Sequence, residues 1–361
     1  MVTAFRNRAH RDFDPRQQLV MFLNTSITMN NTSVDGNVTS YLDMDITHVM
    51  TVYVYRIIYV VGVIGNTFTA VVWVRSRLKV SPVCYFIALS LVDNLVILTH
   101  ALETQHSVNI QGLCQLVHIV FLAVQILAIL LVLGMSIERY IEICHPMLGG
   151  KILTITRTKR VIILLAAVSL LLSTLEGYTW AMDPVSDTCD LRTHLPSRYL
   201  WIYGFSVIIL FFVTPLLCVI ILNVLVIAVL SKARRHSSAY GRSMMKPAKA
   251  SFNTPFLVVS LYLAISELVY ALVHLSYYLG PSDRSTWLHS SPLTGRWRSY
   301  DIKSIPLLFA DAAALSSYAL DLTVFTLSSK TFRKEAVGLI PCRKRKNQVF
   351  LSRNLLRRSN A

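Results

Sequence analysis

The chain has 361 residues, of which 54% are apolar and 15% are charged, and its formal net charge is +16. This basic charge suggests a nucleic-acid-binding protein, but the long apolar spans between the basic segments exclude that class and indicate a membrane protein. We find no metal-binding, phosphate-binding or hydrolase motif, so the sequence indicates neither an enzyme nor a metalloprotein.

Seven stretches are apolar over the roughly 20 residues that a helix needs to cross the hydrocarbon core of a membrane. They are residues 49–75, 82–105, 112–142, 158–181, 198–232, 252–279 and 302–328. A backbone in lipid must satisfy its own hydrogen bonds, so the sequence predicts an all-α membrane protein, a seven-transmembrane helix bundle. The predicted parts are an outer tail (1–48), the bundle (49–328), and a short amphipathic helix with a basic tail (329–361).

Basic residues cluster in the segments that follow spans 1, 3 and 5 and in the C-terminal tail. Cytoplasmic segments are enriched in Lys and Arg, so this pattern places the N-terminus outside the cell. The outer tail contains four Asn-x-Ser/Thr sequences, at Asn24, Asn30, Asn31 and Asn37. We expect glycosylation there, although tails rich in Ser, Thr and Asn also produce this pattern by chance. No apolar run precedes these sequences, so span 1 is expected to act as the signal anchor.

Two cysteines fall in the segments assigned to the outside of the cell. Cys114 lies at the start of span 3, and Cys189 lies in the loop between spans 4 and 5. An oxidising compartment permits a disulfide between them, which would hold this loop over the mouth of the bundle. A pair of free thiols is the alternative.

Three polar residues lie at similar depth inside the spans: Asn66, Asp93 and Asp321. If they converge, two carboxyl groups share a site without water, and either a proton or a sodium ion is required to offset their repulsion. The alternative is a hydrogen-bonded cluster that only holds the helices together.

Nearer the outer face, Arg56, Glu103 and Asp311 lie at similar height in spans 1, 2 and 7. An ion pair among them would leave one acid for a cationic ligand, whereas a pair that only packs helices is the alternative. The expected ligand-binding residues are Glu103, Phe121, Gln125, His274 and Asp311.

Several motifs occur in a fixed order along the chain. Gly65-Asn66 lies in span 1, "LSLVD" in span 2, "ERYIEICHP" at the end of span 3 and "FFVTP" in span 5. These motifs, with Arg139 lying 25 positions after Cys114, resemble those of the rhodopsin-like G protein-coupled receptors over residues 50 to 340.

This resemblance implies a function for the charged end of span 3. In such receptors the arginine of the motif is released when a ligand moves helix 6 outward and a G protein enters the bundle. The implied coupling residues are Glu138, Arg139, Tyr140 and Pro146. A heterotrimeric G protein, an arrestin and membrane lipid are the expected inner partners.

Cys342 in the basic tail is a candidate for palmitoylation, with a free thiol as the alternative.

The chain departs from the family pattern in helices 6 and 7. It has "SELV" at 266–269 where the family usually has Cys-Trp-x-Pro, and "DLTVF" at 321–325 where the family has Asn-Pro-x-x-Tyr. Leu322 therefore replaces the proline, and we expect span 7 to lack its kink. The segment that leads into span 6, "MKPAKASFN", contains no acid that could hold Arg139.

The long outer tail and Glu267 also resemble features of invertebrate neuropeptide receptors of the FMRFamide and myosuppressin type. That likeness implies an extracellular peptide ligand and a location in the plasma membrane. Three alternatives remain open: a chemosensory receptor for small molecules, a transporter that uses ions or protons, and a member of the fold that does not signal. No cofactor is expected other than sodium.

Overall fold

The structure is a computed structural model. It describes residues 46, 48–78, 80–104, 110, 112–183, 188–192, 195–240, 247–279 and 305–339. The four predicted glycosylation sequences at Asn24, Asn30, Asn31 and Asn37 and the predicted palmitoylation site at Cys342 lie outside these residues.

The chain is mostly helical, with one short β-hairpin. In order, the elements are η1 (Met50–Val54), α3 (Tyr55–Arg75), α4 (Ser81–Thr104), α5 (Leu113–Cys144), α6 (Pro146–Ile152), α7 (Ile155–Ser173), α8 (Glu176–Thr179), β1 (Trp180–Asp183), β2 (Thr188–Leu191), α9 (Ser197–Val207), η2 (Ile208–Val213), α10 (Thr214–Tyr240), α11 (Pro247–Leu279), α12 (Ile305–Ala319), α13 (Asp321–Ser328) and α14 (Lys330–Gly338). Here η1 and η2 are π-helical turns that continue into the helices beside them.

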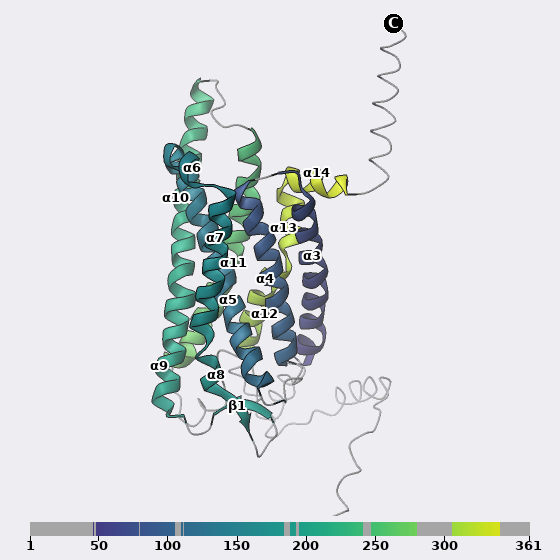
Figure 1. The fold of residues 1–361 in the computed structure, drawn as a ribbon, viewed down its shortest axis with the longest axis vertical. Coiled ribbons are helices and arrows are strands. Elements are labelled where there is room, and N and C mark those ends of the chain that lie inside the picture. Colours follow the sequence, from purple (N-terminus) through teal and green to yellow (C-terminus); the bar gives the residue numbers. More distant parts are fainter. Residues whose placement is uncertain are drawn as a thin grey trace, which may run out of the picture.

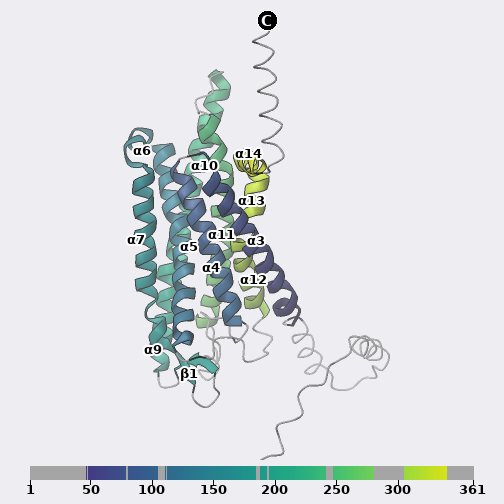
Figure 2. The same ribbon diagram turned by 45° about the vertical axis from the view of Figure 1, so that its right-hand side comes forward.

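The helices form one bundle along a common axis (Figure 1). Among the described residues, six helical segments are long and apolar enough to cross a membrane, and the bent pair α12 and α13 makes a seventh. The β-hairpin lies at one end of the bundle and α14 lies across the other end (Figure 1). Helix α7 lies at the edge of the bundle, packed on α5 and α4 (Figure 2). The predicted seven-helix fold is therefore confirmed.

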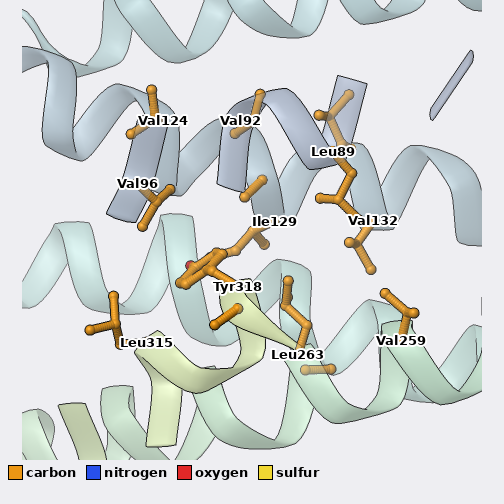
Figure 3. Close-up of a cluster of buried hydrophobic side chains, with 14 of the residues drawn as sticks. Leu89, Val92, Val96, Val124, Ile129, Val132, Val259, Leu263, Leu315 and Tyr318 are labelled. Atoms are coloured by element: carbon orange, nitrogen blue, oxygen red, sulfur yellow. The ribbon is translucent and has the colours of Figure 1, made fainter. Parts of the chain in front are cut away.

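Apolar side chains of α4, α5, α11 and α12 meet inside the bundle (Figure 3). Tyr318 of α12 lies among valine, leucine and isoleucine side chains of α4, α5 and α11, and it is almost completely buried. The labelled members of this cluster are Leu89, Val92, Val96, Val124, Ile129, Val132, Val259, Leu263 and Leu315. Helices in lipid associate through close packing of this kind, so the cluster holds the bundle together around the polar groups described below.

Two predicted spans differ from the structure in detail. Span 4, expected at 158–181, ends as helix α7 at Ser173, and after the short helix α8 the chain enters strand β1 at Trp180. Strand β1 pairs with β2 in antiparallel fashion, and Met182 is opposite Cys189. The end of the predicted span therefore belongs to the outer hairpin, where its hydrogen bonds go to β2.

Span 7 contradicts the expectation that it lacks a kink. Helices α12 and α13 meet at Leu320 with a bend of 55°, although no proline is present. The Asn66 side chain donates a 2.7 Å hydrogen bond from Nδ2 to the carbonyl oxygen of Tyr318, which the Leu322 amide would bond in a regular helix. A side chain that takes a backbone hydrogen bond from a helix is an established cause of kinks. The Asn66 side chain therefore accounts for the bend in span 7 in the absence of a proline.

Helix α14 follows α13 directly and matches the predicted amphipathic segment. Its first turn is capped by Ser329, whose hydroxyl accepts from the Phe332 amide at 3.1 Å. Phe332 is buried, and its ring lies 5.5 Å from Trp73 and 5.6 Å from Phe325. This contact anchors α14 to α3 and α13 at the inner end of the bundle.

Candidate functional site

At the outer end of the bundle, a carboxyl group connects three helices. Asp311 of α12 accepts a 2.7 Å hydrogen bond at Oδ2 from the hydroxyl of Tyr55 in α3. The same oxygen lies 3.3 Å from Nε2 of His100 in α4. The Tyr59 hydroxyl lies 2.8 Å from the other ring nitrogen of His100. Tyr55, His100 and Asp311 are all buried. The cluster therefore ties α3, α4 and α12 together beside the outer mouth.

The two oxygens of the Asp311 carboxyl group have different surroundings. Both contacts to Asp311 reach Oδ2, and within the described part of the chain Oδ1 receives no hydrogen bond. No Lys or Arg among the described residues forms an ion pair with Asp311. The Oδ1 atom is therefore available to a hydrogen-bond donor from a ligand.

The second predicted ligand acid, Glu103, lies in a separate pair. Its Oε1 is 3.5 Å from Nδ1 of His118 in α5, and the His118 ring stacks on Trp180 at 3.9 Å between centroids. Cys114 and Cys189 form a disulfide, as predicted, and pack with Trp180. The disulfide therefore holds the hairpin against the start of α5, directly beside the pair of Glu103 and His118.

Arg56 does not form the internal ion pair that we expected with Glu103 or Asp311. Its side chain is on the exposed face of α3, whereas Tyr55 is on the buried face. Neighbouring residues on a helix point about 100° apart, and here Tyr55 points into the bundle while Arg56 points away from it. The expectation was wrong because apolar spans do not show which face of a helix meets the lipid.

The remaining predicted ligand residues lie inside the bundle. The Phe121 ring is buried and lies 6.0 Å from the ring of His100. His274 of α11 is buried, stacks edge-on against Tyr270 at 4.2 Å and lies near Asp311. Gln125 lies one helical turn below Phe121 and is also buried. The structure thus brings Phe121, His274 and Asp311 to one site, with Gln125 deeper.

Asn66, Asp93 and Asp321 are completely or almost completely buried at the bend of span 7. The carboxyl groups of Asp93 and Asp321 contact each other. Asn66 Oδ1, Asp93 Oδ1 and Asp321 Oδ2 have no hydrogen-bond partner among the residues that the structure describes. These oxygens suit a hard cation such as sodium, and a shared proton is the other way to relieve the repulsion.

A third acid lies above this pair. Glu267 of α11 is 1% exposed, and it faces the Tyr318 hydroxyl. Neither of its carboxyl oxygens makes a hydrogen bond of good geometry to a described residue. Buried acids in a membrane bundle are costly, so Glu267 marks this region as polar despite the apolar packing around Tyr318.

At the inner end of the bundle, Arg139 forms an ion pair within its own helix. Nη1 of Arg139 lies 2.5 Å from Oε2 of Glu142, three residues further along α5. The Arg139 side chain is 6% exposed and that of Glu142 is 21% exposed. The Arg139 side chain is therefore buried, and Glu142 is its ion-pair partner.

Glu138, directly before Arg139, interacts with a different set of groups. Its Oε1 accepts from the hydroxyls of Tyr85 at 3.0 Å and Thr158 at 2.9 Å. Its Oε2 accepts from the hydroxyl of Ser81, which lies 2.7 Å from the Thr158 hydroxyl. Glu138 thus joins α5 to α4 and α7 and does not bond Arg139.

The same region contains a cavity of about 510 Å³. Its lining comes from α4, α5, α6 and the start of α7, and it includes Glu138, Arg139, Glu142 and Pro146. Tyr140 lies outside this lining and packs edge-on against His145, with ring centroids 5.7 Å apart. Three of the four predicted coupling residues therefore border one cavity.

The sequence did not identify several residues that the structure places in these sites. Tyr55 and Tyr59 are four residues apart and so share one face of α3, a spacing that could have indicated their common role. His118 and Trp180 meet only because the disulfide folds the hairpin back on α5. Their contact depends on the tertiary fold and has no signal in the sequence.

Comparisons with known proteins agree with this arrangement. The sequence model of the family described as "7 transmembrane receptor (rhodopsin family)" matches residues 65–299, which is more than half of the chain.

Two curated relatives are similar over shorter stretches. Neuromedin-U receptor 1 from Rattus norvegicus is 26% identical over 188 residues, which cover 48% of this chain and 44% of the relative. Neuromedin-U receptor 1 from Homo sapiens is 28% identical over 116 residues, which cover 30% of this chain and 27% of the relative. The matched stretch thus spans less than half of the length of each relative.

Proposed function

Because the chain belongs to the rhodopsin family of seven-transmembrane receptors, we propose that it is a plasma-membrane receptor for a peptide with a cationic group. We propose further that it signals to heterotrimeric G proteins through Arg139. The N-terminus would lie outside the cell, with glycans on the four predicted asparagines. Arrestin and membrane lipid would be further inner partners, the lipid in contact with α14 and with a palmitate on Cys342.

The observation that carries the ligand proposal is the arrangement of the Asp311 carboxyl group. One of its oxygens accepts from Tyr55 and lies beside His100, and the other has no donor in the described part of the chain. A guanidinium or ammonium group of a ligand would meet a carboxylate that is already oriented, which favours a charge-assisted hydrogen bond. Phe121 and His274 would surround it.

The relatives support a peptide in particular. Both are named as receptors for neuromedin U, a neuropeptide, and we extend only the ligand class to this chain. Glu103 lies below the hairpin and provides a second acid that a basic peptide could contact. A small-molecule sensor on the same fold is the second candidate, and the test below separates the two.

We propose a sodium ion or a proton at Asp93 and Asp321. The carboxyl oxygens and the Asn66 amide oxygen that lack partners among the described residues are of the type that sodium accepts. Such a cation would bind these residues at the bend between α12 and α13, between the outer and inner sites.

The ligand class can be tested in cells that express the chain. Calcium and cyclic-AMP responses would be recorded against amidated peptides with and without Arg or Lys, and in parallel against biogenic amines and small odorants. We expect a dose-dependent response to one series of basic peptides and none to the amines. A response to odorants alone would favour the small-molecule sensor. Silence with confirmed surface expression would contradict a signalling receptor.

A further inference from the structure

Beside the outer hairpin, three residues form a group of side chains that can bind a metal ion. Cys114 and His118 are four positions apart on α5, a spacing that puts them on one face of the helix. Cys189 comes from strand β2. One donor atom from each of the three lies within 4.8 Å of the others, and all three residues are buried. Within the described part of the chain, no other group of three such side chains brings its donor atoms this close.

The two cysteines of this group become metal ligands when their disulfide is reduced. They are joined in the structure, and a thiolate rather than a disulfide sulfur is the metal ligand. A dithiol, such as that of a thiol–disulfide oxidoreductase, passes two electrons and two protons to the cysteines and becomes a disulfide itself. The Cα atoms of Cys114 and Cys189 are 5.7 Å apart, so both sulfur atoms can reach one zinc ion at the usual distance of about 2.3 Å.

The His118 imidazole is already held beside the two cysteines. Its ring stacks on Trp180 at 3.9 Å between centroids, and Oε1 of Glu103 lies 3.5 Å from its Nδ1. A carboxylate at this distance acts in one of two ways in zinc sites: it binds the metal as a fourth ligand, or it accepts the second ring N–H and orients the imidazole. Both ways favour zinc at this position.

We propose that Cys114, His118 and Cys189, together with Glu103, bind a zinc ion when the disulfide is reduced. Zinc binding displaces the two thiol protons, which pass to solvent. Two thiolates and an imidazole select zinc over magnesium and calcium, which prefer oxygen ligands. The proposal depends neither on the ligand of the receptor nor on a G protein.

A zinc ion at this site would replace the covalent connection between the hairpin and the bundle. Both cysteines are buried, so the hairpin has to open before a dithiol can reach them. After reduction, β2 is connected to α5 by noncovalent contacts around Trp180. Zinc that binds both elements closes the hairpin again and stabilises the reduced receptor by mass action.

The test uses the purified full-length receptor, reduced with tris(2-carboxyethyl)phosphine, which is converted to its phosphine oxide as the thiols form. After removal of the reductant without oxygen, thiol counting shows that both cysteines are reduced, and bound zinc is measured with a chromophoric chelator. Cys84, Cys144 and Cys218 are free thiols before and after this treatment, so zinc that they hold is present in both samples. We expect one additional zinc ion after reduction. Cobalt in place of zinc should show the absorption bands of a tetrahedral site with thiolate ligands. Equal zinc content before and after reduction overturns the proposal.

Variants identify the ligands without affecting the initial fold, because they keep the disulfide until it is reduced. Glu103→Gln should weaken zinc binding to the reduced receptor roughly 10- to 100-fold, and His118→Gln should weaken it at least as much. His274→Gln is the matched control, since it removes another buried histidine from the outer half of the bundle and should leave zinc affinity unchanged. Unchanged affinity in His118→Gln overturns the proposal.

Thermal unfolding provides a second readout. The unfolding midpoint of the reduced receptor should rise with zinc but not with magnesium, and His118→Gln should lose most of this rise. An equal rise with both metals, or an equal rise in the variant, contradicts a site at His118. None of these measurements needs a peptide or a G protein, so their failure is distinguishable from a failure of the proposed function.

Discussion

Asp311 shows how one side chain can prepare a ligand site inside an apolar bundle. Tyr55 and His100 both approach the same oxygen of the carboxyl group, which orients it and leaves the second oxygen available. Such an arrangement reduces the cost of ordering the site when a ligand binds. The Arg139 guanidinium differs from the Asp311 carboxyl group, because it is already paired with Glu142 in the structure. That guanidinium is the group that would bind a G protein.

The charge of Asp311 predicts the ligand preference. Asp311→Asn keeps the shape and the acceptor for Tyr55 but removes the charge, so affinity for a cationic peptide should fall roughly 10- to 100-fold. A peptide with its basic group replaced by a neutral one should be affected far less. Competition binding on membranes measures both. Glu176→Gln is the control, because Glu176 is a buried acid that Tyr203 bonds at 2.9 Å, away from Asp311. Equal losses of affinity for both peptides would show that Asp311 does not contact the basic group of the ligand.

The proposed cation predicts an effect of sodium on affinity. If sodium binds Asp93 and Asp321 in the resting state, rising sodium should lower agonist affinity, and Asp93→Asn should abolish this dependence. Agonist affinity would be measured against sodium concentration, with N-methylglucamine chloride at the same ionic strength as the control. If rising sodium does not change agonist affinity in the parent receptor, sodium is not the cation at Asp93 and Asp321, and a shared proton remains.

At the level of elements, two spans depart from regular α-helix. Helices α12 and α13 meet at 55° because Asn66 takes the carbonyl of Tyr318. In span 5, the π-helical turn η2 precedes Pro215, and the Thr214 hydroxyl donates to the carbonyl oxygen of Ile209 at 2.8 Å. The bend of span 7 brings Asp321 against Asp93, so the shape of the element creates the polar site.

The role of Asn66 in the bend can be tested by stability. Asn66→Ala leaves the Tyr318 carbonyl without its donor, so we expect a loss of roughly 1–3 kcal/mol in unfolding free energy. The measurement is the thermal midpoint of purified receptor. Asn94→Ala is the matched control, since its Nδ2 donates only a 3.3 Å hydrogen bond to Thr67 on the exposed side. If both variants lose the same amount of stability, the bond from Asn66 does not hold the bend.

For the whole molecule, hydropathy was sufficient to predict the seven spans, because a membrane requires continuous apolar helices. The spacing of Cys114 and Arg139 was sufficient to place the disulfide cysteine and the coupling motif at opposite ends of span 3. The bend at Leu320 was not predictable, since its cause is a residue 252 positions from Tyr318 along the chain. The orientation of Arg56 and the pairing of Glu103 with His118 depend on helix rotation, which uniform apolar spans do not encode.

The central claim is that a ligand bound at the outer site activates a G protein through Arg139. Its most direct test is nucleotide exchange on purified heterotrimeric G proteins reconstituted with the receptor, with the active basic peptide added. We predict that the peptide accelerates exchange with the parent receptor, and that Arg139→Gln abolishes the acceleration while peptide binding persists. Unchanged acceleration with Arg139→Gln would contradict the account, as would a parent receptor that binds the peptide but never accelerates exchange.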